Sequence, residues 1–172
     1  MKKQSAGLLV YKIEDGQIKV LIAHMGSPWW ANKDKGAWTI PKGGLEEGEE
    51  PIAAARREFK EELGYDAPAG ELIELGSIDQ KNNKTVTAWA VEGDVDTSKI
   101  VSNTFEAEWP PRSGKTQEYP EVDRAAYFNL DEAAEKLIPE QIPLLERLAE
   151  RLKMPWAPKA AKSENPQQNT LF

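Results

Sequence analysis

The sequence predicts a mixed α/β (α+β) fold in which helices cover the faces of a mixed β-sheet. Three observations predict it: strand-like runs open the chain, one helical run interrupts them, and two amphipathic helical runs close it. Strands and helices in that order are typical of a layered domain. At 172 residues the chain is long enough for one domain with a proper core. We expect this domain to span 1–154, and a polar, disordered tail to span 155–172.

The strands are predicted from β-branched and aliphatic runs that lie between turn residues. By this criterion strands are expected at 6–13, 18–24, 38–40, 72–78, 85–91 and 125–128. The first two are expected to form a hairpin around Glu14-Asp15-Gly16, and the fourth and fifth a second hairpin. A loop is predicted at 26–36. The stretch 93–120 is long, polar and contains proline, so we expect a functional or disordered loop there.

The best-defined helix is predicted over 51–63. Proline suits the first helical position, Glu49 and Glu50 complement the positive end of the helix dipole, and Gly64 is placed to be the left-handed residue after the last turn. Its apolar residues are spaced three and four apart, as a helix packed on a core requires. Further amphipathic helices are expected at 130–137 and 142–152.

Composition argues against several functional classes. The 29 acidic and 22 basic residues give a net charge of -7 without a dense Lys/Arg block, so a nucleic-acid polymer or a membrane surface is not expected as partner. The absence of cysteine excludes disulfides, thiolate metal sites and a cysteine nucleophile. No apolar run approaches the ~20 residues that span a bilayer, and the apolar stretch near the N-terminus is too short for an export signal. A cytoplasmic protein is expected.

Three glutamates, Glu58, Glu61 and Glu62, share one narrow face of the predicted helix. A helical step of about 100° puts Glu62 about 40° from Glu58, with Glu61 about 60° to the other side. Such carboxylates repel each other, and the helix dipole opposes negative charge near the C-terminus. A cation on that face would offset both penalties, and oxygen ligands favour Mg²⁺ or Mn²⁺. Taken alone, the three residues suit a solvated acidic face better than a metal site.

The surrounding segment decides between these two interpretations. It reads Gly43-x5-Glu49-x7-Arg57-Glu58-Phe59-Lys60-Glu61-Glu62-Leu63-Gly64-Tyr65 and resembles the Nudix box, the signature of hydrolases that act on nucleoside diphosphates linked to another moiety. Phe59 and Tyr65 stand at packing positions where the family usually has aliphatic residues. The resemblance extends to about Leu152. It implies a small MutT-like domain with a Nudix-type α/β/α sandwich and a mixed β-sheet, and pyrophosphohydrolase activity.

The resemblance also implies residue roles. The metal-ligand candidates are Glu58, Glu61, Glu62 and the backbone carbonyl of Lys42. Glu58 and Glu61 are also catalytic candidates, and which glutamate is the general base is left open. Arg57 is grouped with them in a supporting role: we expect it to pair with Glu49, because a guanidinium fork matches a carboxylate.

Some family members add a glutamate from a late loop as ligand or base. Glu121 is the candidate here and Glu118 the runner-up, although an ordinary solvated acid suits either one equally well. His24, the only histidine, is expected to be neutral and to have no catalytic role.

Four side chains are candidates for contact with the substrate. Lys42 can offer a point charge to a phosphate, and Trp38 and Trp109, together with Tyr119, can stack on a nucleobase. The alternatives are a solvated lysine and tryptophans that anchor core or loop.

The function expected is Mg²⁺- or Mn²⁺-dependent hydrolysis of a pyrophosphate bond in a small nucleotide-type molecule, such as a nucleoside triphosphate or dinucleoside polyphosphate, by a monomer or homodimer. The rival function is a Nudix-fold module that senses a nucleotide without cleaving it. Loss of glutamates from the box would favour that rival, and none is lost.

Overall fold

The structure is a computed structural model that describes residues 2–159. Its strands are β1 (Lys3–Glu14), β2 (Gln17–Met25), β3 (Trp38–Thr39), β4 (Lys42–Gly44), β5 (Leu72–Gln80), β6 (Lys84–Glu92), β7 (Thr104–Glu108), β8 (Thr116–Pro120) and β9 (Val122–Asn129). Its helices are α1 (Pro51–Leu63), α2 (Leu130–Lys136) and α3 (Ile142–Arg151), with short 3₁₀ segments η1 (Pro28–Trp30), η2 (Thr97–Lys99) and η3 (Pro139–Gln141).

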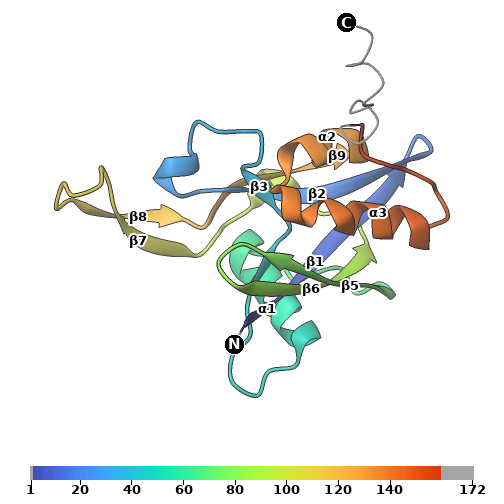
Figure 1. Ribbon diagram of the computed structural model, residues 1–172, viewed down its shortest axis with the longest axis horizontal. Coiled ribbons are helices and arrows are strands. Elements are labelled where there is room, and N and C mark those ends of the chain that lie inside the picture. The colour runs from blue at the N-terminus through green and yellow to red at the C-terminus, as the bar shows by residue number, and fades with distance from the viewer. Residues whose placement is uncertain (1, 160–172) are drawn as a thin grey trace, which may run out of the picture.

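The main sheet is organised around β1 (Figure 1). One edge of β1 pairs antiparallel with β2 and, nearer the N-terminus, with β4; the other edge pairs parallel with β6. The sheet continues from β6 to β5, and from β2 to β3 and β9. The β1–β2 turn uses Asp15 (φ 53°) and Gly16 (φ 73°), the left-handed pair that a two-residue hairpin prefers. The predicted mixed sheet is therefore confirmed.

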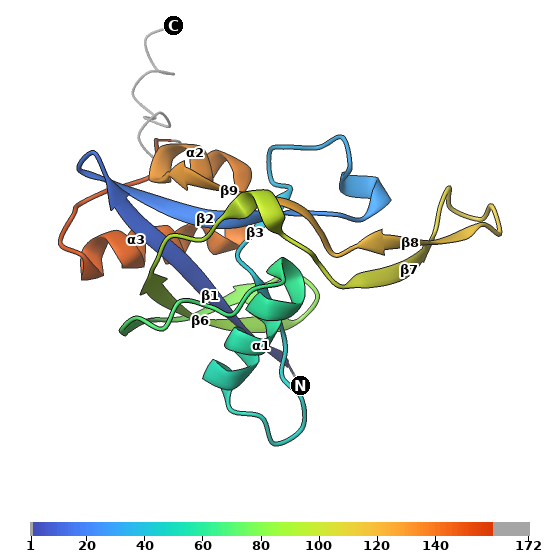
Figure 2. The ribbon, with the colours of Figure 1, turned by 180° about the vertical axis from the view of Figure 1, so that it is seen from behind.

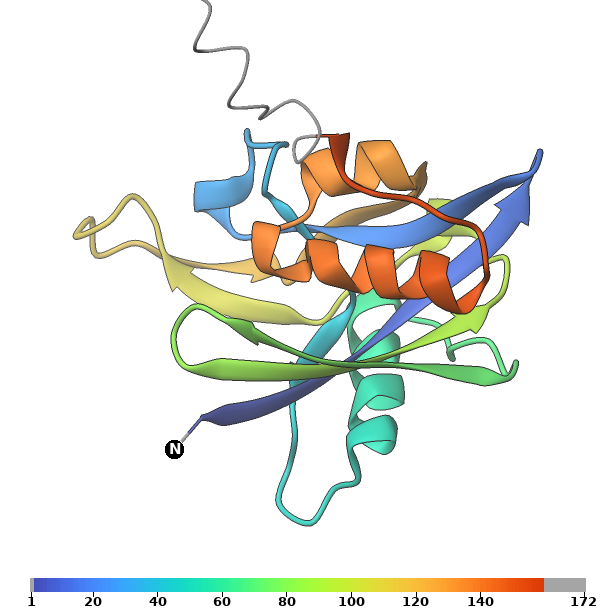
Figure 3. The ribbon, with the colours of Figure 1, turned by 45° about the vertical axis from the view of Figure 1, so that its right-hand side comes forward.

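Both faces of this sheet are covered by helices. Successive residues of a strand point to opposite faces, and β1 divides its side chains accordingly. Leu9 and Tyr11 lie in one buried cluster with the residues of α2 and α3, whereas Leu8 and Val10 lie in the other with Phe59 of α1. Figure 3 shows α2 and α3 on one side of the sheet, and Figure 2 shows α1 on the other. The layered α/β/α arrangement is as predicted.

Helix α1 has the bounds that the sequence predicts. It begins at Pro51 and ends at Leu63, and Gly64 follows with φ 83°. A Cβ at Gly64 would press on the backbone of Val101, so this position needs glycine for space as well as for conformation. Within residues 2–159 no helix is long and apolar enough to cross a membrane.

The predicted loop at 93–120 is wrong over much of its length. It contains η2 and then β7 and β8, which pair only with each other and stand out from the body as a separate two-stranded sheet (Figures 1 and 3). The segment 104–108 does alternate polar and apolar residues, but Pro110, Pro111 and Gly114 follow it closely and favour a loop. The hairpin is missed because a ribbon that buries little apolar surface carries only a weak strand signal.

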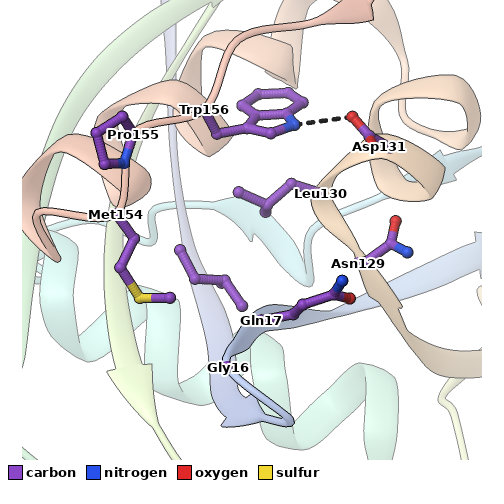
Figure 4. Close-up of a pocket in the computed structure, with 9 residues that line it drawn as sticks. Gly16, Gln17, Asn129, Leu130, Asp131, Met154, Pro155 and Trp156 are labelled. Atoms are coloured by element: carbon purple, nitrogen blue, oxygen red, sulfur yellow. Dashed lines mark hydrogen bonds between the residues drawn. The ribbon is translucent and has the colours of Figure 1, made fainter.

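The predicted tail also begins too early. Trp156 donates its indole N–H to Asp131 Oδ1 (3.0 Å), and Met154 and Trp156 pack against the core (Figure 4). Together with Gly16 and Leu130 they line a cavity of about 210 Å³. The chain is therefore packed at least as far as Trp156, and the predicted tail residues 160–172 lie outside the described residues.

Gln141 joins the C-terminal layer to the strand that leads into β4. The side chain is fully buried; Oε1 accepts from the N–H of Ile40 (2.8 Å), and Nε2 donates to Thr39 Oγ1 (2.8 Å) and Gln80 Oε1 (2.9 Å). One amide thus satisfies a buried N–H two residues before Lys42. It fixes the path of the chain into β4.

We expect Gln141→Ala to destabilise the protein by about 2 kcal/mol, because a buried donor and acceptor left unpaired cost roughly 1–3 kcal/mol each. Urea unfolding followed by circular dichroism measures this. The matched control is Gln4→Ala at an exposed position of β1, which should change stability by less than about 0.5 kcal/mol. Equal effects of the two substitutions would contradict the role assigned to Gln141.

Candidate functional site

The three glutamates of α1 differ in exposure because the helix lies against β4. The side chain of Glu61 is 37% exposed and that of Glu58 12%, while Glu62 is 5% exposed as a residue. Glu62 Oε1 lies 3.4 Å from the backbone N–H of Lys42. The three carboxylates thus range from partly exposed at Glu61 to buried beside β4 at Glu62.

The Glu58 carboxylate occupies the space that a side chain at Gly43 would fill. A Cβ at Gly43 would strike the carboxyl group of Glu58, so that carboxylate rests directly on the β4 backbone. Gly43 pairs with Ala6 of β1, and Lys42 directs its N–H toward Glu62. Since the N–H and C=O of one strand residue point to the same side, the Lys42 carbonyl also faces α1.

Arg57 donates hydrogen bonds to several residues of the segment 43–65, and it pairs with Glu49 as predicted. Nε and Nη2 donate to the two carboxylate oxygens of Glu49 (2.9 and 2.8 Å), and Nη2 also donates to the carbonyl of Gly44 (2.9 Å). Nη1 donates to Glu58 (2.8 Å) and Glu61 (3.2 Å). The hydrogen bonds that Arg57 donates to Glu49 lower the pKa of Glu49 to about 2 and raise the pKa of Arg57.

Glu121 reaches the same cluster from far along the chain. Its N–H donates to the carbonyl of Asn103 (2.9 Å), its carbonyl accepts from Gly26, and Asn103 N–H donates to the carbonyl of Glu61 at the end of α1 (2.8 Å). Burial raises the pKa of the Glu121 carboxyl group, and the neighbouring Glu61 raises it further. The structure thus brings Glu121 together with the α1 glutamates. Glu118, the runner-up, is an exposed residue of β8.

The ionised carboxylates of the cluster are destabilised by burial and by one another, so a nearby positive charge would stabilise them. Burial raises the pKa of both Glu62 and Glu58, and their neighbouring carboxylates add to the shift. The side chain of Lys42 lies among them: burial lowers its pKa, while Glu62, Glu58 and Glu121 raise it. The Lys42 ammonium therefore lies near enough to these carboxylates to interact with them.

Two observations indicate that a divalent ion fits here. Glu62 Oε2 is buried and accepts no hydrogen bond, and the glycine at position 43 leaves Glu58 a place on the backbone. All donors are oxygens, which suits Mg²⁺ or Mn²⁺. Within residues 2–159, however, no three acidic or histidine side chains already converge as a metal site. Arg57 Nη1 holds Glu58 Oε1 and Glu61 Oε2, so a shift of Glu58 away from Arg57 would free both of its oxygens for an ion.

The two tryptophan candidates, Trp38 and Trp109, differ in exposure. Trp38 is 3% exposed, donates its indole N–H to Asp34 (2.8 Å) and packs edge-on against His24 and Phe128. This burial contradicts the prediction that Trp38 stacks on a substrate base. Trp109 lies at the outer end of β7 and is 37% exposed.

His24 is buried, and both of its ring nitrogens are used in structural contacts. Nδ1 lies 2.7 Å from Asp123 Oδ1, and Nε2 lies 2.6 Å from the Lys33 carbonyl. These contacts leave no ring nitrogen free for a substrate.

Sequence reasoning missed Trp29 and Phe105. Trp29 is 45% exposed, and its ring centroid lies 6.4 Å from that of Phe105 and 6.3 Å from that of Trp109. Phe105 and Trp109 lie 76 and 80 positions after Trp29, so no local sequence pattern signals these contacts.

Comparison with known proteins agrees with the geometry of the box. The NUDIX domain family matches residues 1–148. The RNA pyrophosphohydrolase of Bartonella bacilliformis is 34% identical over 109 residues, 55% of this chain and 58% of that protein. Nudix hydrolase 25 of Arabidopsis thaliana is 59% identical over 29 residues, 17% of each chain. The matched regions thus span little more than half of the first relative and a small part of the second.

Solved structures give the same fold. A binary complex of the C. elegans Ap4A hydrolase aligns with a TM-score of 0.60 at 22% identity, covering 87% of this chain and 98% of that one. The NUDIX domain of Shewanella oneidensis NrtR, crystallised with ADP ribose, aligns with a TM-score of 0.60 at 15% identity, covering 88% and 89%. At such identities the likeness establishes the fold alone.

The Glu49–Arg57 pair predicts a specific pH dependence of stability. Glu49 has a folded-state pKa of about 2, below its ordinary value of 4.5, so its contribution is complete above pH 4.5 and is lost as pH falls toward 2. We expect wild type to be more stable than Glu49→Gln near neutral pH and the difference to shrink between pH 5 and pH 3. Urea unfolding across that range measures it, and a difference that grows on acidification would contradict the pairing.

Proposed function

The chain belongs to the Nudix family, and on that premise we propose that it is a divalent-metal-dependent pyrophosphohydrolase. The observation that carries the proposal is the buried, unpartnered Oε2 of Glu62, in a cluster of carboxylates that the box glycine and Arg57 hold against β4. Unpaired acceptors are costly inside a protein. A function that depends on a bound cation would account for the buried, unpaired Oε2 of Glu62.

Each group of the site would have a distinct task. Glu58, Glu62 and the carbonyl of Lys42 would hold the ion, with Glu61 beside them. When bound, the ion would neutralise phosphate charge and acidify a water molecule. Hydrolysis would add a water molecule to one phosphorus, break the bridging P–O bond and deliver a proton to a carboxylate. Glu121 would suit that base, because it lies outside this ligand set and burial raises its pKa toward neutral pH.

Lys42 and Arg57 would support this chemistry without bond breaking. Once an ion takes over the charge balance of Glu62, the Lys42 ammonium becomes available to a phosphate oxygen as a point charge. Arg57 keeps Gly44 and Glu49 in place while it releases Glu58. Lys42 would thus be the cation beside the carboxylates when no metal is bound, and Arg57 the cation that holds Gly44 and Glu49 in place.

The proposed substrate is a small nucleotide-type pyrophosphate, such as a nucleoside triphosphate or dinucleoside polyphosphate. The name of the Bartonella bacilliformis relative adds RNA that carries a pyrophosphate bond to the candidates, whereas the net charge of -7 disfavours a polymer. A cytoplasmic location and a monomeric or homodimeric state remain predictions from the sequence.

A phosphate-release panel with Mg²⁺ or Mn²⁺ tests the function. It includes nucleoside triphosphates, diadenosine tetraphosphate, nucleotide sugars, ADP-ribose, NADH and a 5′-triphosphorylated RNA. We expect release from at least one small nucleotide and its loss in excess EDTA. Nucleotide binding without release would support the alternative, a sensing module, and full activity in EDTA would contradict metal dependence.

We expect Glu62→Gln to lower turnover by more than about 100-fold, because it removes an ion ligand that supports several kcal/mol of charge stabilisation. The variant should melt at or above the wild-type temperature, since one of several crowded charges is gone. The matched control is Glu47→Gln, an exposed residue between β4 and α1, which should retain wild-type turnover. Wild-type turnover in Glu62→Gln would refute the assignment.

A further inference from the structure

The β7–β8 hairpin has two chemically distinct faces. In its register Phe105 pairs with Tyr119 and Ala107 with Gln117, and these pairs alternate with the pair Glu106–Glu118. Residues two apart on a strand share a face. One face is therefore aromatic near the base of the hairpin and the other is acidic.

The aromatic face begins at the candidate active site. The hydrogen bond from Glu121 N–H to the Asn103 carbonyl continues the ladder, and Trp109 N–H to the Lys115 carbonyl extends it at the other end. With a rise of about 3.4 Å per residue, the Phe105–Tyr119 pair lies about 7 Å, and the Trp109–Lys115 pair about 20 Å, from the Asn103–Glu121 pair. The aromatic residues of this face therefore lie at distances from the carboxylates that a nucleotide can span.

Trp29 completes this face from another part of the chain. The loop that carries η1 lies beside the hairpin (Figures 1 and 3). The indole of Trp29 contacts both Phe105 and Trp109, and Ala107, which lies between them on that face, has only a methyl group and leaves it room. The ring pairs are inclined by 67° and 45°, so they do not stack face to face and hide each other.

The exposure of these rings is unusual for this protein. Within residues 2–159 the exposed large hydrophobic side chains are Ile13, Trp29, Val101 and Trp109. Two of the four are indoles in contact with each other, and contiguous apolar exposure marks binding surfaces. The acidic opposite face and the net charge of -7 disfavour a polyanionic partner. A small, flat, uncharged ring suits the surface better.

We propose that Trp29, Phe105, Trp109 and Tyr119 form a platform on which the nucleobase of the substrate stacks while its phosphates reach Glu121 and the α1 carboxylates. This inference rests on the proposed function, since it identifies how the same site selects a base-containing pyrophosphate. Aromatic rings bind any base by its π-face, so the platform gives selectivity for base over no base rather than for one base over another.

The test uses the whole chain with Trp109→Ala and, separately, Trp29→Ala. With the best nucleotide of the release panel, we expect KM to rise about 10-fold and kcat to stay within twofold, since stacking on one ring contributes a factor of this order. The matched controls are Ile13→Ala, which removes an exposed apolar residue elsewhere, and Glu106→Gln on the acidic face. Both should keep the wild-type KM.

A second readout does not depend on hydrolysis. The chain has six tryptophans, so their indole N–H signals can be followed by NMR during titration with adenosine and with base-free tripolyphosphate. We expect adenosine to shift the signals of Trp29 and Trp109, and tripolyphosphate to leave them in place.

The two readouts separate the two proposals. Adenosine-dependent shifts with no phosphate release from any substrate would leave the platform standing and remove the hydrolase. Hydrolysis with an unchanged KM in both variants would overturn the platform. Equal shifts with adenosine and tripolyphosphate would overturn it as well, because they would show that the base is not what is bound.

Discussion

The structure depends on the placement of several negative charges close together in a partly buried position. Glu58 and Glu62 face β4, Glu61 flanks them, and Glu121 arrives from the base of the hairpin. Burial and mutual repulsion raise the pKa values of three of these carboxyl groups. Such a cluster is stable only beside positive charge, and the chain supplies two sources of it. Lys42 lies among the carboxylates, and Arg57 joins them to Glu49 and Gly44.

Much of the fold was predictable because local signals agree there with packing. Pro51 and Gly64 mark the two ends of α1, and the apolar positions between them face the sheet. Asp15 and Gly16 set a hairpin whose strands alternate between two buried layers. In these segments residue type, turn geometry and burial all favour the same structure, so sequence alone sufficed.

The β7–β8 hairpin was missed, since its stability comes from pairing between its own strands and from contact with a distant loop. Trp156 was placed in a tail because the chain past Pro155 turns to alanine, lysine, proline and polar residues; its partner, Asp131, lies 25 positions earlier. The same limit affected the site. Spacing identified Glu58, Glu61 and Glu62, and the pairing of Arg57 with Glu49, but could not show that Trp38 is a core residue or that Trp29 contacts Trp109. Exposure and contacts between distant segments are properties of the folded chain.

The central claim is that this carboxylate cluster exists to hold a divalent ion, and anomalous scattering from a crystal soaked in Mn²⁺ tests it most directly. The account predicts a manganese peak within coordination distance of Glu58, Glu62 and the Lys42 carbonyl, with Glu58 moved off Arg57. A well-ordered crystal with no peak there, in which Arg57 still holds Glu58 and Glu62 Oε2 stays unpartnered, would contradict it.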